Sequence, residues 1–150
     1  MLWMNVALVE ARLAPDHGDV PVGAVVVANE RVVGRGHNQV EGLGDPTAHA
    51  EILAIGAASQ TLRASRLTGA TIYVTMEPCP MCAGAMVLAR IDRLVYGCRD
   101  PKSGYCGSLG NIVDDPALNH KVSVRSGVLE EECASLMSGF FAELRGRGKD

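Results

Sequence analysis

The sequence has 150 residues, a formal charge of −3 and 47% hydrophobic but only 4% aromatic residues. This length fits one domain, residues 1–150, with enough apolar side chains for a core. No apolar run approaches the roughly 20 residues of a membrane span, and the first predicted helix carries Glu10 and Arg12, unlike a signal peptide. We therefore expect a cytoplasmic single-domain protein.

Hydrophobic periodicity and turn residues predict alternating helices and strands along the chain. The expected helices are 3–13, 49–58, 80–90 and 129–144. The expected strands are 22–28, 31–34, 70–75, 94–97 and 121–124, and a glycine-rich loop is expected over 98–110. This alternation favours a three-layer α/β domain.

Two short motifs supply three metal ligands and one further carboxylate. His49 and Glu51 stand two residues apart at a predicted helix start, and Cys79 and Cys82 stand three apart around Pro80. That spacing places both sulfurs on one face of the first helical turn, and proline suits the first helical position. The partial positive charge of a helix N-terminus also favours the thiolate form. His49, Cys79 and Cys82 are therefore predicted to bind zinc.

Three protein ligands indicate a catalytic site, because structural zinc is normally closed by four ligands. Two thiolates and a neutral imidazole cancel the charge of the ion. Its water should then be less acidic than in an all-histidine site, where the pKa falls to about 7, and a base is needed. Glu51 is predicted to take a proton from zinc-bound water and to deliver protons to a ring nitrogen and to a departing amine. The motifs thus predict hydrolytic deamination.

Each motif alone has a simpler explanation, since an isolated C-x-x-C is often a structural zinc pair or a redox motif and an isolated H-x-E is usually accidental. Their combination is much rarer, and we interpret it as catalytic. The other cysteines, Cys98, Cys106 and Cys133, are expected to be reduced thiols. A fourth thiolate ligand would close the position that catalysis needs.

The two motifs resemble the H-x-E and P-C-x-x-C pattern of the zinc-dependent base and nucleoside deaminases. Further segments narrow the resemblance to the bacterial tRNA adenosine deaminases: 19–24, 45–51, 73–79, 99–104, 107–109 and 119–120. This resemblance implies the cytidine deaminase fold, three-layer α/β/α with a central five-stranded mixed sheet. It also implies a homodimer with one zinc ion per subunit, which converts the wobble adenosine of arginine tRNA to inosine.

Carried over position by position, the resemblance makes His49, Cys79 and Cys82 the zinc ligands and Glu51 the proton shuttle. It also implies six substrate contacts: Asn38 hydrogen-bonds the flipped base, Val22 and Met76 form its walls, Asp100 and Lys102 meet the backbone and ribose of the anticodon loop, and Phe141 packs near a neighbouring base.

Simpler explanations stay open for several of these contacts. A turn position would also explain Asn38, a solvated loop would explain Asp100 and Lys102, and burial in the core would explain Phe141.

The sequence departs from the family pattern at several positions. Met76 replaces a common leucine, Pro80 replaces a common valine, and Tyr105 and Cys106 occupy positions that usually hold small residues. None of these residues is a predicted metal ligand. The departures therefore bear on substrate contacts more than on the reaction.

Charge is the main argument against an RNA substrate, because phosphate binding usually needs a basic protein and this chain has a pI near 5.8. A local cluster of Arg145, Arg147 and Lys149 on the last helix would supply positive charge for RNA binding in spite of the acidic pI. Two other functions stay open. One is a deaminase of a free base or nucleoside such as guanine or cytosine, and the other is a zinc-stabilised RNA-binding module without activity.

Overall fold

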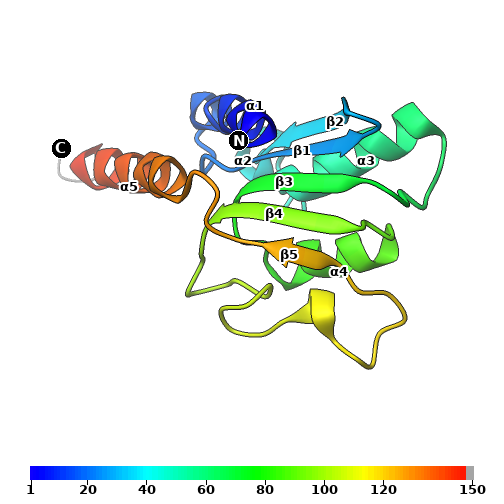
Figure 1. The fold of residues 1–150 in the computed structure, drawn as a ribbon. Helices are drawn as coiled ribbons and strands as arrows, with labels where there is room; N and C mark the ends of the chain where they lie inside the picture. Colours follow the sequence, from blue (N-terminus) through cyan, green and yellow to red (C-terminus); the bar gives the residue numbers. More distant parts are fainter. Residues whose placement is uncertain (148–150) are drawn as a thin grey trace.

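A computed structural model of the chain describes residues 1–147 (Figure 1). The strands are β1 (Gly23–Ala28), β2 (Arg31–His37), β3 (Thr71–Met76), β4 (Arg93–Cys98) and β5 (Ser123–Arg125). The helices are α1 (Leu2–Ala11), α2 (Val40–Leu43), α3 (Ala50–Leu62), α4 (Pro80–Leu88) and α5 (Glu130–Arg147), with 3-10 turns η1 (Ala14–His17) and η2 (Ile112–Asp114). Within the described residues, no helix combines the length and apolar character that a membrane crossing requires.

The five strands form one mixed sheet in the order β2-β1-β3-β4-β5. Strand β1 is antiparallel to β2 and β3, whereas β3, β4 and β5 are mutually parallel. Met76 at the end of β3 pairs with Cys98 at the end of β4, and Gly23 at the start of β1 pairs with His37 at the end of β2. The segments that follow β2, β3 and β4 therefore emerge at one edge of the sheet.

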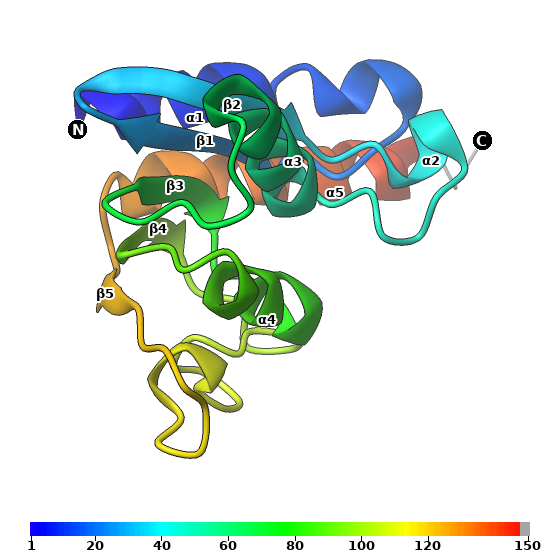
Figure 2. The same cartoon turned by 90° about the vertical axis from the view of Figure 1, so that its right-hand side faces the viewer.

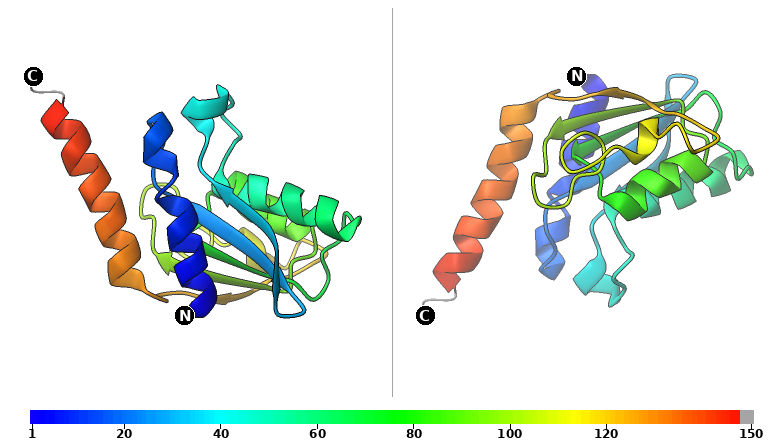
Figure 3. Two further views of the ribbon diagram at one scale, coloured as in Figure 1. Left: turned by 90° about the horizontal axis from the view of Figure 1, so that it is seen from above. Right: turned by 90° about the horizontal axis from the view of Figure 1, so that it is seen from below.

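Helices cover both faces of the sheet, so the predicted three-layer α/β/α fold with five mixed strands is confirmed. Ala24 and Val26 of β1 belong to a core shared with α3 and α4. The alternate residues Val25 and Val27 pack on the other face with side chains of α1 and with Cys133 of α5. Figure 3 shows α1 and α5 on one side of the sheet and α3 and α4 on the other. In Figure 2 the connection from β4 to β5 lies beside α4, against which η2 packs.

Strand β2 continues to His37, although we predicted that it ends at Gly34. Its glycines do not break the strand but allow α3 to pack directly on it. A Cβ atom on Gly34 would lie 2.2 Å from the carbonyl oxygen of Ala54, and one on Gly36 would lie 2.4 Å from that of Ala50. Because Ala50 begins α3, this close packing fixes the helix end that carries the H-x-E motif.

Three short segments, η1, α2 and η2, were not predicted. They contain only three or four residues each, which is too short to show helical periodicity. Helix α2 begins where the buried carboxylate of Asp19 accepts hydrogen bonds from the backbone N–H groups of Glu41 at 2.7 Å and Gly42 at 2.9 Å. A contact between residues this far apart in the sequence gives no local signal. The other predicted elements exist, with ends that differ by up to four residues.

Candidate metal centre and substrate pocket

The three predicted ligands meet where two helices begin. His49 is the N-cap residue of α3, and Cys79 is the N-cap residue of α4. Pro80 occupies the start of α4, and Cys82 lies in its first turn, as the spacing predicted. The predicted helix start at His49 was one residue early, because this residue has an extended backbone. Two helix N-termini thus direct partial positive charge toward the thiols.

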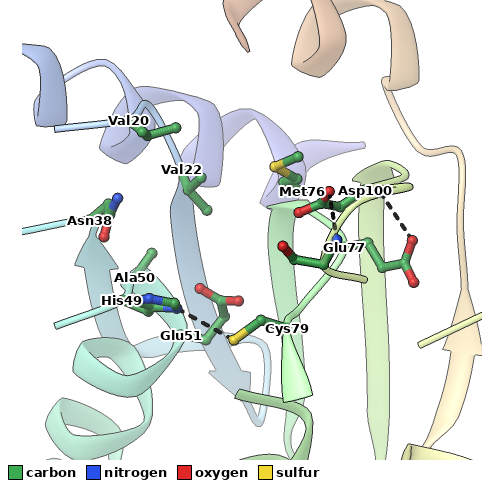
Figure 4. Close-up of a pocket in the computed structure, with 11 residues that line it drawn as sticks. Val20, Val22, Asn38, His49, Ala50, Glu51, Met76, Glu77, Cys79 and Asp100 are labelled. Carbon is green, nitrogen blue, oxygen red and sulfur yellow. Dashed lines mark hydrogen bonds between the residues drawn. The ribbon is translucent and has the colours of Figure 1, made fainter. Parts of the chain in front are cut away.

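The geometry of this cluster fits one tetrahedral zinc ion. Nδ1 of His49 lies 3.5 Å from Sγ of Cys79 and 3.5 Å from Sγ of Cys82, and all three ligand atoms lie within 4.8 Å of one another. Zinc–nitrogen and zinc–sulfur bonds of about 2.05 and 2.3 Å at a tetrahedral angle give an N···S separation of roughly 3.5 Å. Figure 4 shows His49 facing Cys79 across this site. The donor set and the spacing both suit zinc.

Hydrogen bonds distribute the protons of this cluster unequally among its three side chains. A hydrogen bond from Cys82 lowers the pKa of Cys79 to about 4. That same hydrogen bond, together with burial, raises the pKa of Cys82, and the hydrogen bond with Cys79 raises the pKa of His49. Since zinc requires a neutral imidazole and two thiolates, binding of the ion must release protons from this cluster.

Glu51 lies in the first turn of α3, next to the ligands, and its side chain is buried. Burial raises the pKa of Glu51 to about 7, although its backbone hydrogen bond and the charge of His49 oppose the shift. Glu51 is not a member of the three-residue metal cluster. A carboxyl group that titrates near neutral pH can both accept and donate a proton there.

A cavity of about 220 Å³ opens in front of the ligands and Glu51. Its walls are Val20, Val22, Asn38, His49, Ala50, Glu51, Met76, Glu77, Cys79, Asp100 and Ser103 (Figure 4). Four of the six predicted substrate contacts belong to this wall: Val22, Asn38, Met76 and Asp100. The volume lies below the roughly 300 Å³ at which drug-sized ligand pockets begin, so the cavity suits a single base.

Asn38 lines this cavity and carries an unpaired side-chain acceptor. Its backbone N–H donates a hydrogen bond at 3.0 Å to the carbonyl oxygen of Val22, which directly precedes β1. Its side-chain Oδ1 is buried and has no hydrogen-bond partner among the described residues. A turn position does not explain such an atom. A buried acceptor without a donor costs about 1–3 kcal/mol, which a ligand N–H would recover.

Lys102 and Phe141 line a second cavity of about 630 Å³ instead. It adjoins the first, because Met76, Asp100 and two further residues line both. Phe141 is 40% exposed and contacts Phe140 edge to face at 5.4 Å, so burial in the core does not explain it.

The three residues of the predicted basic cluster on α5 do not share one environment. Arg145 lines the second cavity. Arg147 instead pairs with Glu143 at 2.7 Å, and Lys149 lies outside the described residues. Positive charge at the second cavity therefore comes from Lys102 and Arg145.

Several residues of the first cavity were not predicted from the sequence: Val20, Ala50, Glu77 and Ser103. Of these, Glu77 had a recognisable signal, because an acidic residue follows directly on an apolar strand and precedes the cysteine motif. Its carboxylate accepts hydrogen bonds from the loop after β4. The sequence alone does not bring that loop and Glu77 together.

The remaining cysteines, Cys98, Cys106 and Cys133, are free and buried, as expected. Burial raises the pKa of the Cys98 thiol to about 11 and that of Cys106 and Cys133 to about 12. Thiols with such pKa values stay protonated at neutral pH. None of them belongs to the metal cluster found among residues 1–147.

Comparisons with known proteins agree with this site. A sequence model of the MafB19-like deaminase family matches residues 1–145. A tRNA-specific adenosine deaminase of Bacillus subtilis (strain 168) is 49% identical over 148 residues, which cover 99% of this chain and 92% of the relative. The chain belongs to the tRNA-specific adenosine deaminase family.

A solved structure from work on A-to-I editing by tRNA:A34 deaminases matches this member of the family with a TM-score of 0.87. It is 47% identical and covers 90% of this chain and 98% of its own. The guanine deaminase of Nitrosomonas europaea matches with a TM-score of 0.79 over 93% of this chain and 83% of its own, but at 23% identity. The latter likeness concerns the fold alone, so the comparisons favour the tRNA deaminases over the free-base deaminases.

Proposed function

We propose that this protein deaminates the wobble adenosine of tRNA to inosine, with arginine tRNA as the expected substrate. We further propose that it acts in the cytoplasm as a homodimer and that residues 1–150 form one catalytic domain. The main observation in support of this activity is the three-ligand metal site with the buried, non-ligating Glu51 beside it. High identity to tRNA-specific adenosine deaminases supports the choice of substrate.

The proposed chemistry assigns one task to each group. His49, Cys79 and Cys82 would hold the ion, which would supply an acidified, nucleophilic water. Glu51 accepts a proton from water and donates one to the ring nitrogen beside the attacked carbon. It then passes a proton to the amino group, which leaves as ammonia while the oxygen of water replaces it.

The proposed recognition of RNA uses both cavities. Single-stranded loops are read by splaying bases into pockets, and a base to be modified is taken out of its stack. The target adenine enters the first cavity between Val22 and Met76, and Asp100 faces the nucleotide at its rim. Lys102 and Phe141 in the second cavity contact the neighbouring nucleotide and its backbone. This local arrangement needs few phosphate contacts, which is consistent with the net charge of −3.

Replacing Asn38 by alanine is expected to lower kcat/KM for an anticodon stem-loop by about tenfold, equivalent to roughly 1.4 kcal/mol. The reason is that the variant loses the buried acceptor that the N–H of the adenine amine would satisfy. Steady-state deamination of the stem-loop measures the effect. Gln39→Ala is the matched control, since this neighbouring side chain does not line the first cavity. Equal kcat/KM in Asn38→Ala and the native protein would remove Asn38 from substrate binding.

The proposed substrate is tested with a panel. The zinc-loaded protein is incubated with an arginine anticodon stem-loop carrying adenosine at the wobble position, the same loop carrying guanosine, and free guanine, cytosine, adenosine and cytidine. We expect inosine only from the first substrate. Turnover of a free base or nucleoside alone would favour the alternative deaminase, and binding of the loop without any turnover would favour the RNA-binding module.

A further inference from the structure

A buried carboxylate joins the zinc-ligand segment to the loop that follows β4. Glu77 lies between Met76 of the pocket wall and the cysteine motif, and its side chain is only 3% exposed. Strands β3 and β4 are parallel with Met76 opposite Cys98, and the backbone N–H of Glu77 donates to the carbonyl oxygen of Cys98 at 2.8 Å. The two segments that follow these strands therefore start side by side.

Four donors from one loop surround the carboxylate of Glu77. Its Oε1 accepts hydrogen bonds from the backbone N–H of Asp100 at 3.1 Å and from the hydroxyl of Ser108. Its Oε2 accepts hydrogen bonds from the backbone N–H groups of Cys106 and Ser108, both at 3.0 Å. A carboxylate has about four acceptor sites, so none remains for a substrate.

The loop closes tightly on this side chain. A Cβ atom on Gly104 would lie 2.3 Å from Cδ and 2.5 Å from Oε2 of Glu77, so only glycine fits there. Beside it, the backbone N–H of Tyr105 donates to the carbonyl oxygen of Pro78 at 2.9 Å. Figure 4 shows Glu77 next to Asp100 at the end of β3. The conformation of the loop after β4 therefore depends on the carboxylate of Glu77.

The same loop forms the boundary between the two cavities. Asp100 and Ser103 line both of them, and Lys102 lines the second. Oδ1 of Asp100 accepts hydrogen bonds from the backbone N–H groups of Lys102 at 3.0 Å and Ser103 at 3.1 Å, so these three residues form one turn. The hydrogen bond from Asp100 to Glu77 links this turn to the zinc-ligand segment.

We propose that Glu77 is a positioning residue that holds the loop 100–108 in the shape that binds the RNA loop, and so sets substrate affinity. This inference rests on the proposed function. Glu77 acts through Asp100, Lys102 and Ser103 and touches no reacting atom. Its removal should therefore weaken RNA binding and leave metal binding and the chemical step in place.

Glu77→Gln tests this inference. A glutamine amide would direct N–H donors at backbone N–H donors, which breaks the arrangement at nearly constant volume. Hydrogen exchange of the Asp100, Cys106 and Ser108 amides should become about tenfold faster or more, because their charged acceptor is lost. With the stem-loop, KM should rise about tenfold while kcat stays within about twofold. Zinc should stay at one ion per chain.

Two further variants sharpen the test. Ser108→Ala removes one donor and leaves the three backbone hydrogen bonds, so its KM should lie between those of the native protein and Glu77→Gln. It also keeps the inference testable if Glu77→Gln does not fold. Glu131→Gln on the exposed part of α5 is the matched control and should match the native protein.

Three results would overturn the inference: unchanged exchange at the three amides in Glu77→Gln, faster exchange with unchanged KM, or loss of zinc together with kcat. The last result would place Glu77 in support of the metal site. Failure of the native protein to deaminate the stem-loop would contradict the proposed function instead, and hydrogen exchange would still report whether Glu77 holds the loop.

Discussion

Replacing Glu51 by glutamine is expected to reduce deamination of the anticodon stem-loop by at least about a thousandfold, because general acid–base catalysis contributes about 10²–10⁴ and this residue serves as both base and acid. Glutamine keeps the shape of the side chain and cannot accept or release the protons. Single-turnover formation of inosine measures the rate, and elemental analysis measures the zinc. The zinc content should stay unchanged.

The stability of Glu51→Gln should not fall. Burial raises the pKa of Glu51 to about 7, so ionisation of this carboxyl at alkaline pH costs free energy in the folded state. A neutral glutamine avoids that cost, and the Tm at pH 8 should equal or exceed that of the native protein. Glu41→Gln on α2 is a matched control, because this residue does not line the first cavity. A Glu51→Gln variant that keeps a tenth of the native rate would remove Glu51 from proton transfer.

Cys82→Ala is expected to lose most of the bound zinc and to bring the rate to background. Two ligands remain in this variant, and the activation of water by a metal is worth several kcal/mol, or about a thousandfold or more in rate. Cys133→Ala is the matched control, because Cys133 is also a buried cysteine but lies outside the metal cluster. It should keep one zinc ion per chain and its activity.

Metal removal provides an independent measurement of the same site. A chelator should inactivate the native protein and Cys133→Ala, and added zinc should restore both. Added zinc should not restore Cys82→Ala. Zinc at the native level in Cys82→Ala would mean that the ion is held by other residues.

The metal cluster could be predicted from the sequence because its geometry is local. Cys79 and Cys82 are fixed relative to each other by one helical turn, and His49 lies beside Glu51 at the start of another helix. What the sequence could not provide was the burial of Glu51 and the meeting of the two helix ends. Both depend on how α3 and α4 pack against the sheet.

The glycines of β2 show where local patterns mislead. The predicted strand ended at Gly34, whereas Gly34 and Gly36 both lie within β2 and permit direct contact between the strand and α3. The sequence contains the same glycines in either case. Only the position of Ala50 and Ala54 in the folded chain shows whether these glycines end the strand or allow α3 to pack closely on it.

The substrate contacts were harder to place than the ligands for a related reason. Lys102 and Phe141 lie 39 positions apart in the sequence and meet only because α5 packs beside the loop after β4. The role of Glu77 could not be predicted from the sequence because its hydrogen-bond partners follow it by 23 to 31 positions. Such long-range contacts leave no periodic signal.

The direct seating of α3 on the backbone of β2 limits how this enzyme can be engineered. The helix that carries His49 has no compressible side-chain layer beneath it at Gly34 and Gly36, so it cannot move closer to the strand to make room for a bulkier base. Space for a different nucleobase has to come from trimming Val22 or Met76, whose side chains line the opposite walls. Substrate range can thus be changed by substituting Val22 or Met76 while the metal centre stays unchanged.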